Sequence, residues 1–220
     1  PLDIIKGLLK SKGHVTSKDL VLFSRQLSTL VSAGVPIVQG LSILESAARV
    51  PKGQRFVKHV VTEMGGKNAI IVDADADVDA AVSGSLHSAF GYAGQKCSAA
   101  SRLIVHQAVY ERFVARLVEA AGRLRLGDPA DPSTDMGPLI NAQAKQRLEE
   151  AIDHARSTGK ILHGLERQHL PAKGYFVGPT IVAEIPPTDR LAREELFGPL
   201  VCVFRVSSFE EALKLANDTD

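Results

Sequence analysis

The chain has 220 residues, of which 45% are hydrophobic and 23% are charged, and its formal net charge at pH 7 is +1. These values are typical of a globular protein with a full hydrophobic core. Because the net charge is nearly zero and only 5% of the residues are aromatic, nucleic acid and anionic membranes are disfavoured as partners.

The cysteine content indicates a reducing compartment. Cys97 and Cys202 are too few for a disulfide framework, and no basic segment leads into an apolar secretory sequence. We therefore expect free thiols and a cytoplasmic location. The uncharged stretch from Gln26 to Leu44 is long enough to cross a bilayer, but its many serines and glycines argue against a transmembrane span.

Residues 1–50 predict a pair of helices. Apolar residues recur at helical spacing over 20–31, with Thr16 or Ser17 as the N-cap and Gly34 at the end. Pro36 suits the first turn of a second helix. The basic side chains of this segment favour a solvated polar face over a charged docking surface.

Residues 51–220 predict a second domain, in which short β-rich runs alternate with amphipathic helices. The expected strands are 69–72, 102–106 and 200–204, with further β-rich segments at 160–164 and 175–185. The expected helices are 78–92, 109–124, 142–157 and 209–216. Such alternation is typical of an α/β fold with a mostly parallel sheet covered by helices.

The acidic run at 73–77 imitates the start of a calcium loop. An EF-hand needs glycine at its sixth position and glutamate at its twelfth, and Val78 and Gly84 stand there instead. Asp77 and Asp79 are therefore interpreted as a cap and a dipole partner of the helix that they open.

Other common site patterns are missing from the sequence. The "GGK" at 65–67 lacks the upstream glycine of a P-loop, and no G-x-G-x-x-G follows a predicted strand. The histidines are never four residues apart, which makes a metal site improbable. His87 and His106 are interpreted as structural or surface residues.

The segment "GYAGQKCSAASR" at 91–102 surrounds Cys97 with small side chains. A lone cysteine is more often a buried structural thiol than a nucleophile. Here the small neighbours leave room for a substrate, and Lys96 is suited to stabilise a thiolate. Glu63, beside a glycine pair, is the best candidate for a base, although an ordinary loop carboxylate is the simpler reading of its spacing alone.

Five motifs in order make the stretch from about residue 51 to 220 resemble the catalytic portion of the aldehyde dehydrogenase family. They are "EMGGKNAIIVDADADVDAAV", "AFGYAGQKCSAASRLIV", "GDPADPSTDMGPLI", "GYFVGPTIV" and "REELFGPLV". The first two are most similar to Δ1-pyrroline-5-carboxylate (glutamate semialdehyde) dehydrogenases.

The resemblance implies a role for five residues. Cys97 matches the nucleophile that attacks the aldehyde, with its own backbone N–H in the oxyanion site, and Glu63 matches the base that activates water for thioester hydrolysis. Glu195 matches the residue that binds the nicotinamide ribose, Phe197 the residue that packs near the nicotinamide, and Ser98 a contact to the substrate carboxylate. The implied cofactor is NAD, with NADP left open. Cys97 and Glu63 must then share one cavity.

The resemblance also implies that a nucleotide-binding domain precedes this segment and that closing strands follow it. We therefore expect the chain to be an internal fragment whose activity alone is weak. Residues 15–48 resemble an unrelated protein, the first cytoplasmic domain of type II secretion F and type IV pilus platform proteins.

Two hypotheses of function follow, beside a third possibility that the chain has no cellular role. The first is an enzyme fragment that oxidises an aldehyde, most simply glutamate semialdehyde, to its acid. The second is a module that binds a secretion or pilus component through residues 1–50, with an inert passenger domain. A homo-oligomer is left open.

Overall fold

The computed structural model describes residues 17–32, 41, 65–165 and 169–219. The chain divides into two units, residues 1–63 and 64–220. In the first unit α2 (Ser17–Ser32) confirms the first predicted helix. The second predicted helix lies, apart from Leu41, outside the described residues. None of the described helices combines the length and the apolar character needed to cross a membrane.

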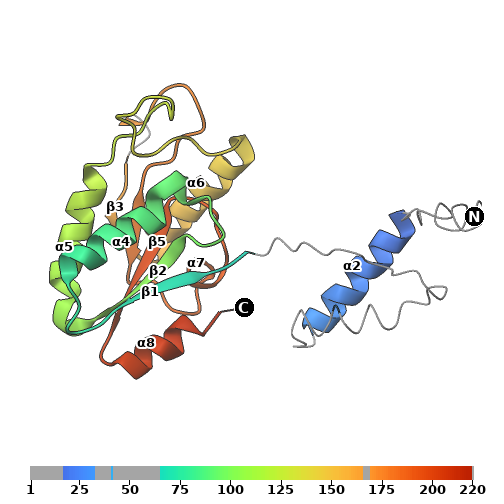
Figure 1. The fold of residues 1–220 in the computed structure, drawn as a ribbon, viewed down its shortest axis with the longest axis horizontal. Helices are drawn as coiled ribbons and strands as arrows, with labels where there is room; N and C mark the ends of the chain where they lie inside the picture. Colours follow the sequence, from blue (N-terminus) through green and yellow to red (C-terminus); the bar gives the residue numbers. More distant parts are fainter. Residues whose placement is uncertain (1–16, 33–40, 42–64, 166–168, 220) are drawn as a thin grey trace, which may run out of the picture. The chain divides into compact units, whose positions relative to one another are not determined.

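The described part of the second unit contains a five-stranded sheet with the order β1-β2-β5-β4-β3 (Figure 1). Its strands are β1 (Asn68–Val72), β2 (Ala100–His106), β3 (Lys160–His163), β4 (Thr180–Ala183) and β5 (Leu200–Val206). All neighbouring strands pair in parallel except β3 and β4, which are antiparallel. The predicted α/β fold with a mostly parallel sheet is therefore confirmed.

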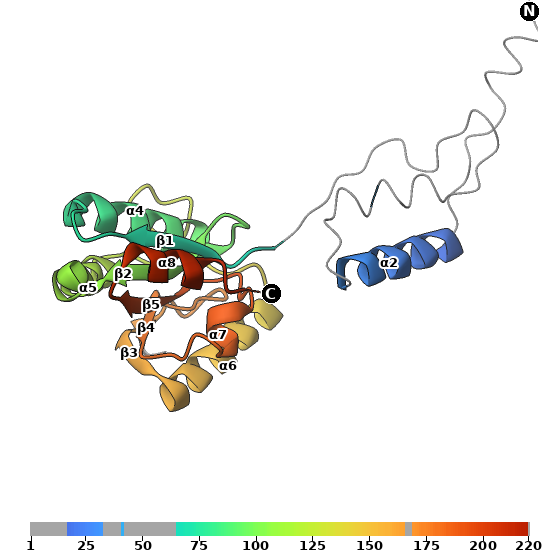
Figure 2. The ribbon, with the colours of Figure 1, turned by 90° about the horizontal axis from the view of Figure 1, so that it is seen from below.

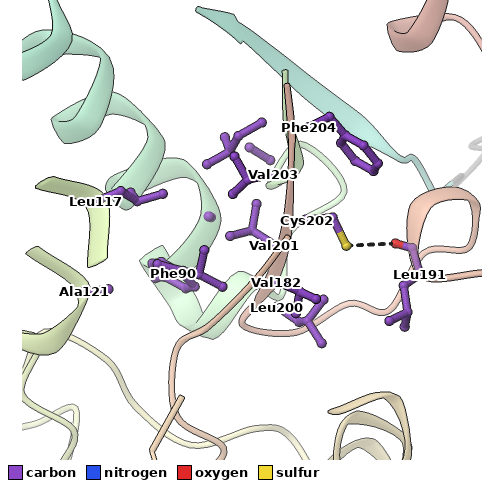
Figure 3. Close-up of a cluster of buried hydrophobic side chains, with 14 of the residues drawn as sticks. Phe90, Leu117, Ala121, Val182, Leu191, Leu200, Val201, Cys202, Val203 and Phe204 are labelled. Atoms are coloured by element: carbon purple, nitrogen blue, oxygen red, sulfur yellow. Dashed lines mark hydrogen bonds between the residues drawn. The ribbon is translucent and has the colours of Figure 1, made fainter. Parts of the chain in front are cut away.

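The central strand β5 is buried on both faces. Its residues alternate between the two sides of the sheet, so Val201 and Val203 lie toward Phe90 and Leu117, while Cys202 lies toward Leu191 (Figure 3). A parallel strand that is covered on both faces has a continuous apolar run rather than an alternating one. The run "LVCVF" is the sequence signal of this position.

Helices cover the sheet from both sides (Figure 2). On one face α4 (Val78–Phe90) and α5 (Gln107–Gly122) pack on each other and on β2, and on the other α8 (Phe209–Ala216) packs on β1, β2 and β5. The remaining described helices of this unit are α6 (Ala142–Thr158), which packs on β3, and the short α7 (Arg190–Arg193).

The predicted caps of α4 are present. Asp77 is the N-cap and its side chain accepts hydrogen bonds from the backbone N–H groups of Asp79 and Ala80, while Asp79 lies in the first helical turn. The acidic run thus satisfies backbone donors at a helix start. His106 is also structural, since it is the N-cap of α5 and its Nδ1 accepts a hydrogen bond from the N–H of Ala108. Helix α5 therefore begins at Gln107, two residues earlier than predicted.

Several predicted boundaries differ from the structure. Helix α4 ends at Phe90 rather than residue 92, because the chain enters a 3₁₀ turn, η1 (Gly91–Gly94), in which Tyr92 and Ala93 have positive φ. Only 180–183 of the segment 175–185 is a strand. Pro179 has no N–H for a sheet ladder, and Glu184 turns out of the strand at φ 59°. The segment 109–124 ends its helix at Gly122.

The turn η1 is held against the segment that precedes β5. Gly94 has φ +67°, and a Cβ added there would lie 2.6 Å from the backbone carbon of Gly198 and 3.0 Å from the oxygen of Ala89. Both the left-handed backbone and the close approach require glycine. This contact fixes the distance between the loop before β2 and the loop before β5.

We expect Gly94→Ala to lower the free energy of unfolding by about 2 kcal/mol or more, from left-handed strain and the backbone clash. The matched control is Gly84→Ala in α4, where an added Cβ meets nothing within 4 Å and helix propensity favours alanine by roughly 0.5–1 kcal/mol. Thermal unfolding of both variants measures the difference. Equal melting temperatures would contradict the role of Gly94.

A second prediction concerns His163 in β3. Burial lowers the pKa of His163, and its Nε2 is buried without a hydrogen-bond partner. As the pH falls, His163 is therefore protonated in the unfolded chain before it is protonated in the folded protein. The stability contributed by neutral His163 is lost as the pH falls from about 6.5 through the lower folded pKa.

The measurement is the melting temperature between pH 8 and pH 5. The wild type should lose more stability over this range than His163→Gln, whereas His87→Gln, at an exposed position, should follow the wild type. The same pH dependence in all three proteins would refute the assignment. The pKa values of Asp131, Asp135 and Glu211 are lowered by hydrogen bonds. These carboxylates therefore stay ionised between pH 8 and pH 5 and do not contribute to the pH dependence measured here.

Candidate active site

Three adjacent parallel strands begin at the same edge of the sheet. Asn68 at the start of β1 pairs with Ala100 at the start of β2, and Arg102 and Cys202 pair two residues into β2 and β5. The loops that precede these strands therefore meet at one edge. Four of the five predicted site residues, Cys97, Ser98, Glu195 and Phe197, lie on the loops before β2 and β5.

Cys97 is exposed on the loop between η1 and β2. Its carbonyl oxygen accepts a 2.6 Å hydrogen bond from Nδ2 of Asn68, which also donates to the carbonyl of Ala99 at 3.1 Å. Gln95 holds the other end of the loop, since its Oε1 accepts from the N–H of Ile140 at 2.9 Å. The thiol is accessible to solvent while its backbone is anchored on both sides.

Glu195 is fixed beside the start of β1. Its Oε1 accepts a 3.2 Å hydrogen bond from the N–H of Gly66. A Cβ added at Gly65 would lie 2.9 Å from the Glu195 carboxyl carbon, so the glycine pair allows the carboxylate to approach the backbone. Glu195 is exposed as a residue, and it lines the small cavity beside Phe197.

Phe197 has a backbone conformation that is rare for an aromatic residue. Its φ is 55° and its side chain is 39% exposed. Left-handed backbone in a bulky residue is costly and is often associated with functional sites. Phe197 and Glu195 line a small cavity of about 20 Å³ together with Gly66, Lys96 and Ser101.

Of the remaining predicted residues, the structure describes Ser98 and Lys96 but not Glu63. Ser98 is exposed directly after Cys97. The Nζ of Lys96 lies 5.1 Å from the centroid of the Tyr92 ring in a cation–π contact, and its effect on the Cys97 thiolate stays a prediction. Glu63 lies outside the described residues, so its proximity to Cys97 also stays a prediction.

Two buried basic residues, Arg102 and Lys67, lie next to this edge of the sheet. Arg102, 2% exposed, donates from Nε and Nη2 to the carbonyl of Lys67, and to the carbonyls of Leu215 and Ala216 at the end of α8. It thereby ties the start of β1 to a helix C-terminus, where the dipole favours a cation. Burial lowers the pKa of Lys67, whose Nζ has no hydrogen-bond partner.

The second thiol is unsuited to chemistry. Cys202 is fully buried, donates to the carbonyl of Leu191 at 3.5 Å (Figure 3), and burial raises its pKa to about 11. A thiol of this kind is almost entirely protonated at neutral pH and unreactive. Among the described residues, the accessible thiol is therefore Cys97.

A larger cavity, of about 860 Å³, lies elsewhere. Its walls include the carboxyl-terminal half of β5 and the end of β4, which is the edge where open α/β sheets usually bind ligands. None of the four predicted site residues that the structure describes lines it. Several of its charged side chains are paired, as in Arg205 with Glu111 and Lys160 with Glu184. Its lining contains no cysteine, so the amino-terminal edge, which carries the exposed thiol of Cys97, is the better candidate.

The sequence analysis missed the residues that support the site. Asn68 stands directly before the apolar run "AIIV", and Arg102 is a charge at the start of a predicted strand. Both residues could have been noticed in the sequence, because a polar side chain that borders a buried strand needs a hydrogen-bond partner. Their partners lie on distant segments and appear only in the fold.

The comparisons with known proteins identify the family of this chain. The model of the family described as "Aldehyde dehydrogenase family" matches residues 39–220. A Bacillus subtilis (strain 168) protein named 1-pyrroline-5-carboxylate dehydrogenase is 44% identical over 181 residues, which is 82% of this chain and 35% of that protein.

Solved structures give the same result. A structure named 1-pyrroline-5-carboxylate dehydrogenase is 46% identical with a TM-score of 0.71, covering 82% of this chain and 34% of that one. A 1-pyrroline-5-carboxylate dehydrogenase from Thermus with bound NAD is 45% identical with a TM-score of 0.71, covering 81% and 34%.

The matches extend over most of the chain. The family match begins at residue 39 and overlaps the end of the segment 15–48, so the predicted domain boundary at residue 50 and the resemblance to platform proteins stay predictions. The chain spans about a third of the length of these relatives, 35% in the Bacillus subtilis protein. With its fold, its exposed cysteine and these matches taken together, the chain belongs to the aldehyde dehydrogenase family.

Proposed function

We propose that the chain supplies the catalytic cysteine, the base and the nicotinamide-facing residues for the oxidation of glutamate 5-semialdehyde to glutamate. One observation carries the proposal. The exposed Cys97 and the exposed Glu195 lie on the loops that precede the neighbouring parallel strands β2 and β5, and both loops are hydrogen-bonded to the segment that starts β1. The names of the relatives at 44% and 46% identity support the substrate.

Cys97 begins the reaction. Its thiolate attacks the aldehyde carbon, and the new C–S bond leaves the negative charge on the former carbonyl oxygen. The backbone N–H of Cys97 donates to that oxygen. Small neighbours such as Ala99 and Ala100 leave space for the tetrahedral carbon, and Ser98 donates to the substrate carboxylate.

The residues before β5 fit a nicotinamide nucleotide. The exposed carboxylate of Glu195 is a suitable acceptor for ribose hydroxyls, and the exposed ring of Phe197 offers an apolar surface for a nicotinamide. NAD, when bound, accepts the hydride that leaves the substrate carbon. NAD is favoured by the Thermus relative with bound NAD, and NADP stays open.

Glu63 completes the cycle. After hydride loss the substrate is a thioester of Cys97, and Glu63 takes a proton from the water that attacks it, which releases the acid and regenerates the thiolate. Support comes from chain connectivity, since Glu63 precedes Gly65 by two residues and Gly65 lies against Glu195 at the same sheet edge.

We expect the chain to hydrolyse an activated ester such as p-nitrophenyl acetate, because acyl transfer to Cys97 needs no nucleotide. Release of p-nitrophenol should fall to the level without protein in Cys97→Ala. Cys202→Ala is the matched control and should leave the rate unchanged. Ester hydrolysis that persists in Cys97→Ala would overturn the proposal.

Substitution of Glu63 separates the two half-reactions. In Glu63→Gln the ester should still acylate Cys97, while deacylation slows by about 100-fold because the general base is lost. Mass spectrometry should then detect an accumulated acetyl group on the peptide containing Cys97. Deacylation at the wild-type rate would assign the base to another residue.

A further inference from the structure

A single side chain holds the backbone on both sides of Ser98. Nδ2 of Asn68 donates to the carbonyl of Cys97 at 2.6 Å and to the carbonyl of Ala99 at 3.1 Å. A primary amide has two N–H donors, so one Asn can serve two acceptors at once. The loop that carries the thiol is thus fixed to the first residue of β1.

This contact occurs at an irregularity of the sheet. The β1–β2 register shifts between Asn68, which pairs with Ala100, and Ala69, which pairs with Arg102. Ser101 is the extra residue of this bulge, and its Oγ donates to the carbonyl of Asn68 at 3.4 Å. Bulges interrupt the backbone ladder and often lie next to active sites. Here the Asn68 side chain provides donors where the ladder is interrupted.

The neighbouring glycine shows how closely the two segments approach. A Cβ added at Gly66 would lie 3.3 Å from the Cys97 carbonyl oxygen and 3.2 Å from Oδ1 of Asn68. The Cys97 carbonyl therefore lies close to Gly66, the same residue whose backbone N–H donates to Glu195. A large rotation of the peptide group after Cys97 must break the hydrogen bond from Asn68 to the Cys97 carbonyl.

We propose that Asn68 is a positioning residue for the chemistry of Cys97: its amide fixes the peptide groups around Ser98 and so sets the direction of the Cys97 thiol and N–H. The proposal rests on Cys97 being the nucleophile. Asn68 touches no substrate in this scheme and acts only through the loop.

The amide is the one group of its size that fits the position. An aspartate has the same shape, but it places a carboxylate oxygen, in place of Nδ2, against the carbonyl oxygens of Cys97 and Ala99, and it adds a negative charge beside the Cys97 carbonyl. Among the described residues, Lys96 and Glu195 are charged and line the small cavity beside this loop, and the buried Lys67 directly precedes Asn68.

Two rates separate positioning from folding. Alkylation of Cys97 by iodoacetamide, followed from pH 6 to pH 10 by mass spectrometry, reports thiolate formation, and Cys202 is an internal control because it is buried. Acylation by p-nitrophenyl acetate needs in addition an N–H aimed at the oxyanion. The ratio of the two rates measures the orientation of the Cys97 backbone.

We expect Asn68→Asp to slow alkylation at pH 7 by about tenfold and to move its pH profile about one unit higher, because a nearby carboxylate disfavours the thiolate. In Asn68→Ala the ratio of acylation to alkylation should fall by about tenfold, since the oxyanion donor loses its orientation. The stability control is Ser208→Ala, which removes the N-cap of α8 at the far end of β5 and should lower the melting temperature without changing either quantity.

The proposal is overturned if Asn68→Asp keeps the wild-type pH profile and Asn68→Ala keeps the wild-type ratio, with only the melting temperature lowered. Failure of the proposed function has a different outcome: the wild type would show no acylation that depends on Cys97. In that event the alkylation rate of Cys97 in Asn68→Ala, compared with the wild type, still decides whether the Asn68 amide holds the loop that carries the thiol.

Discussion

The parallel register of β1, β2 and β5 is the constraint on which the site depends. Because the three strands run in the same direction and begin level with one another, the segments that lead into them must arrive at one edge. Segments around residues 65, 97 and 195 are thereby brought together although 130 positions separate the first from the last, as the hydrogen bond from Gly66 to Glu195 shows. The register brings them together without any direct link along the chain.

The edge is rigid because its support is buried. β5 is covered on both faces, and Arg102 links β2 to the start of β1 and to the end of α8 through carbonyl groups. A buried guanidinium with these acceptors costs less than an unpaired charge and resists displacement. Three glycines, at 65, 66 and 94, then allow the loops above this support to approach within van der Waals distance.

The two cysteines illustrate how surroundings determine chemistry. Cys202 has the same side chain as Cys97, yet burial in β5 raises its pKa to about 11 and directs its hydrogen toward Leu191. Cys97 lies on an exposed loop whose backbone is held by the side chains of Asn68 and Gln95. Accessibility combined with a fixed backbone is what nucleophilic catalysis needs, and packing provides it at only one of the two thiols.

The sequence by itself determined the α/β class and the family, and it predicted Cys97 as the nucleophile, because apolar periodicity and contiguous motifs are local properties. It also predicted the core strand "LVCVF" and the cap at Asp77. The left-handed turn at Tyr92, the contact of Gly94 with Gly198 and the double hydrogen bond of Asn68 were decided only by the tertiary structure. These features depend on segments that meet through strand pairing, and pairing between distant strands leaves no trace in the spacing of nearby residues.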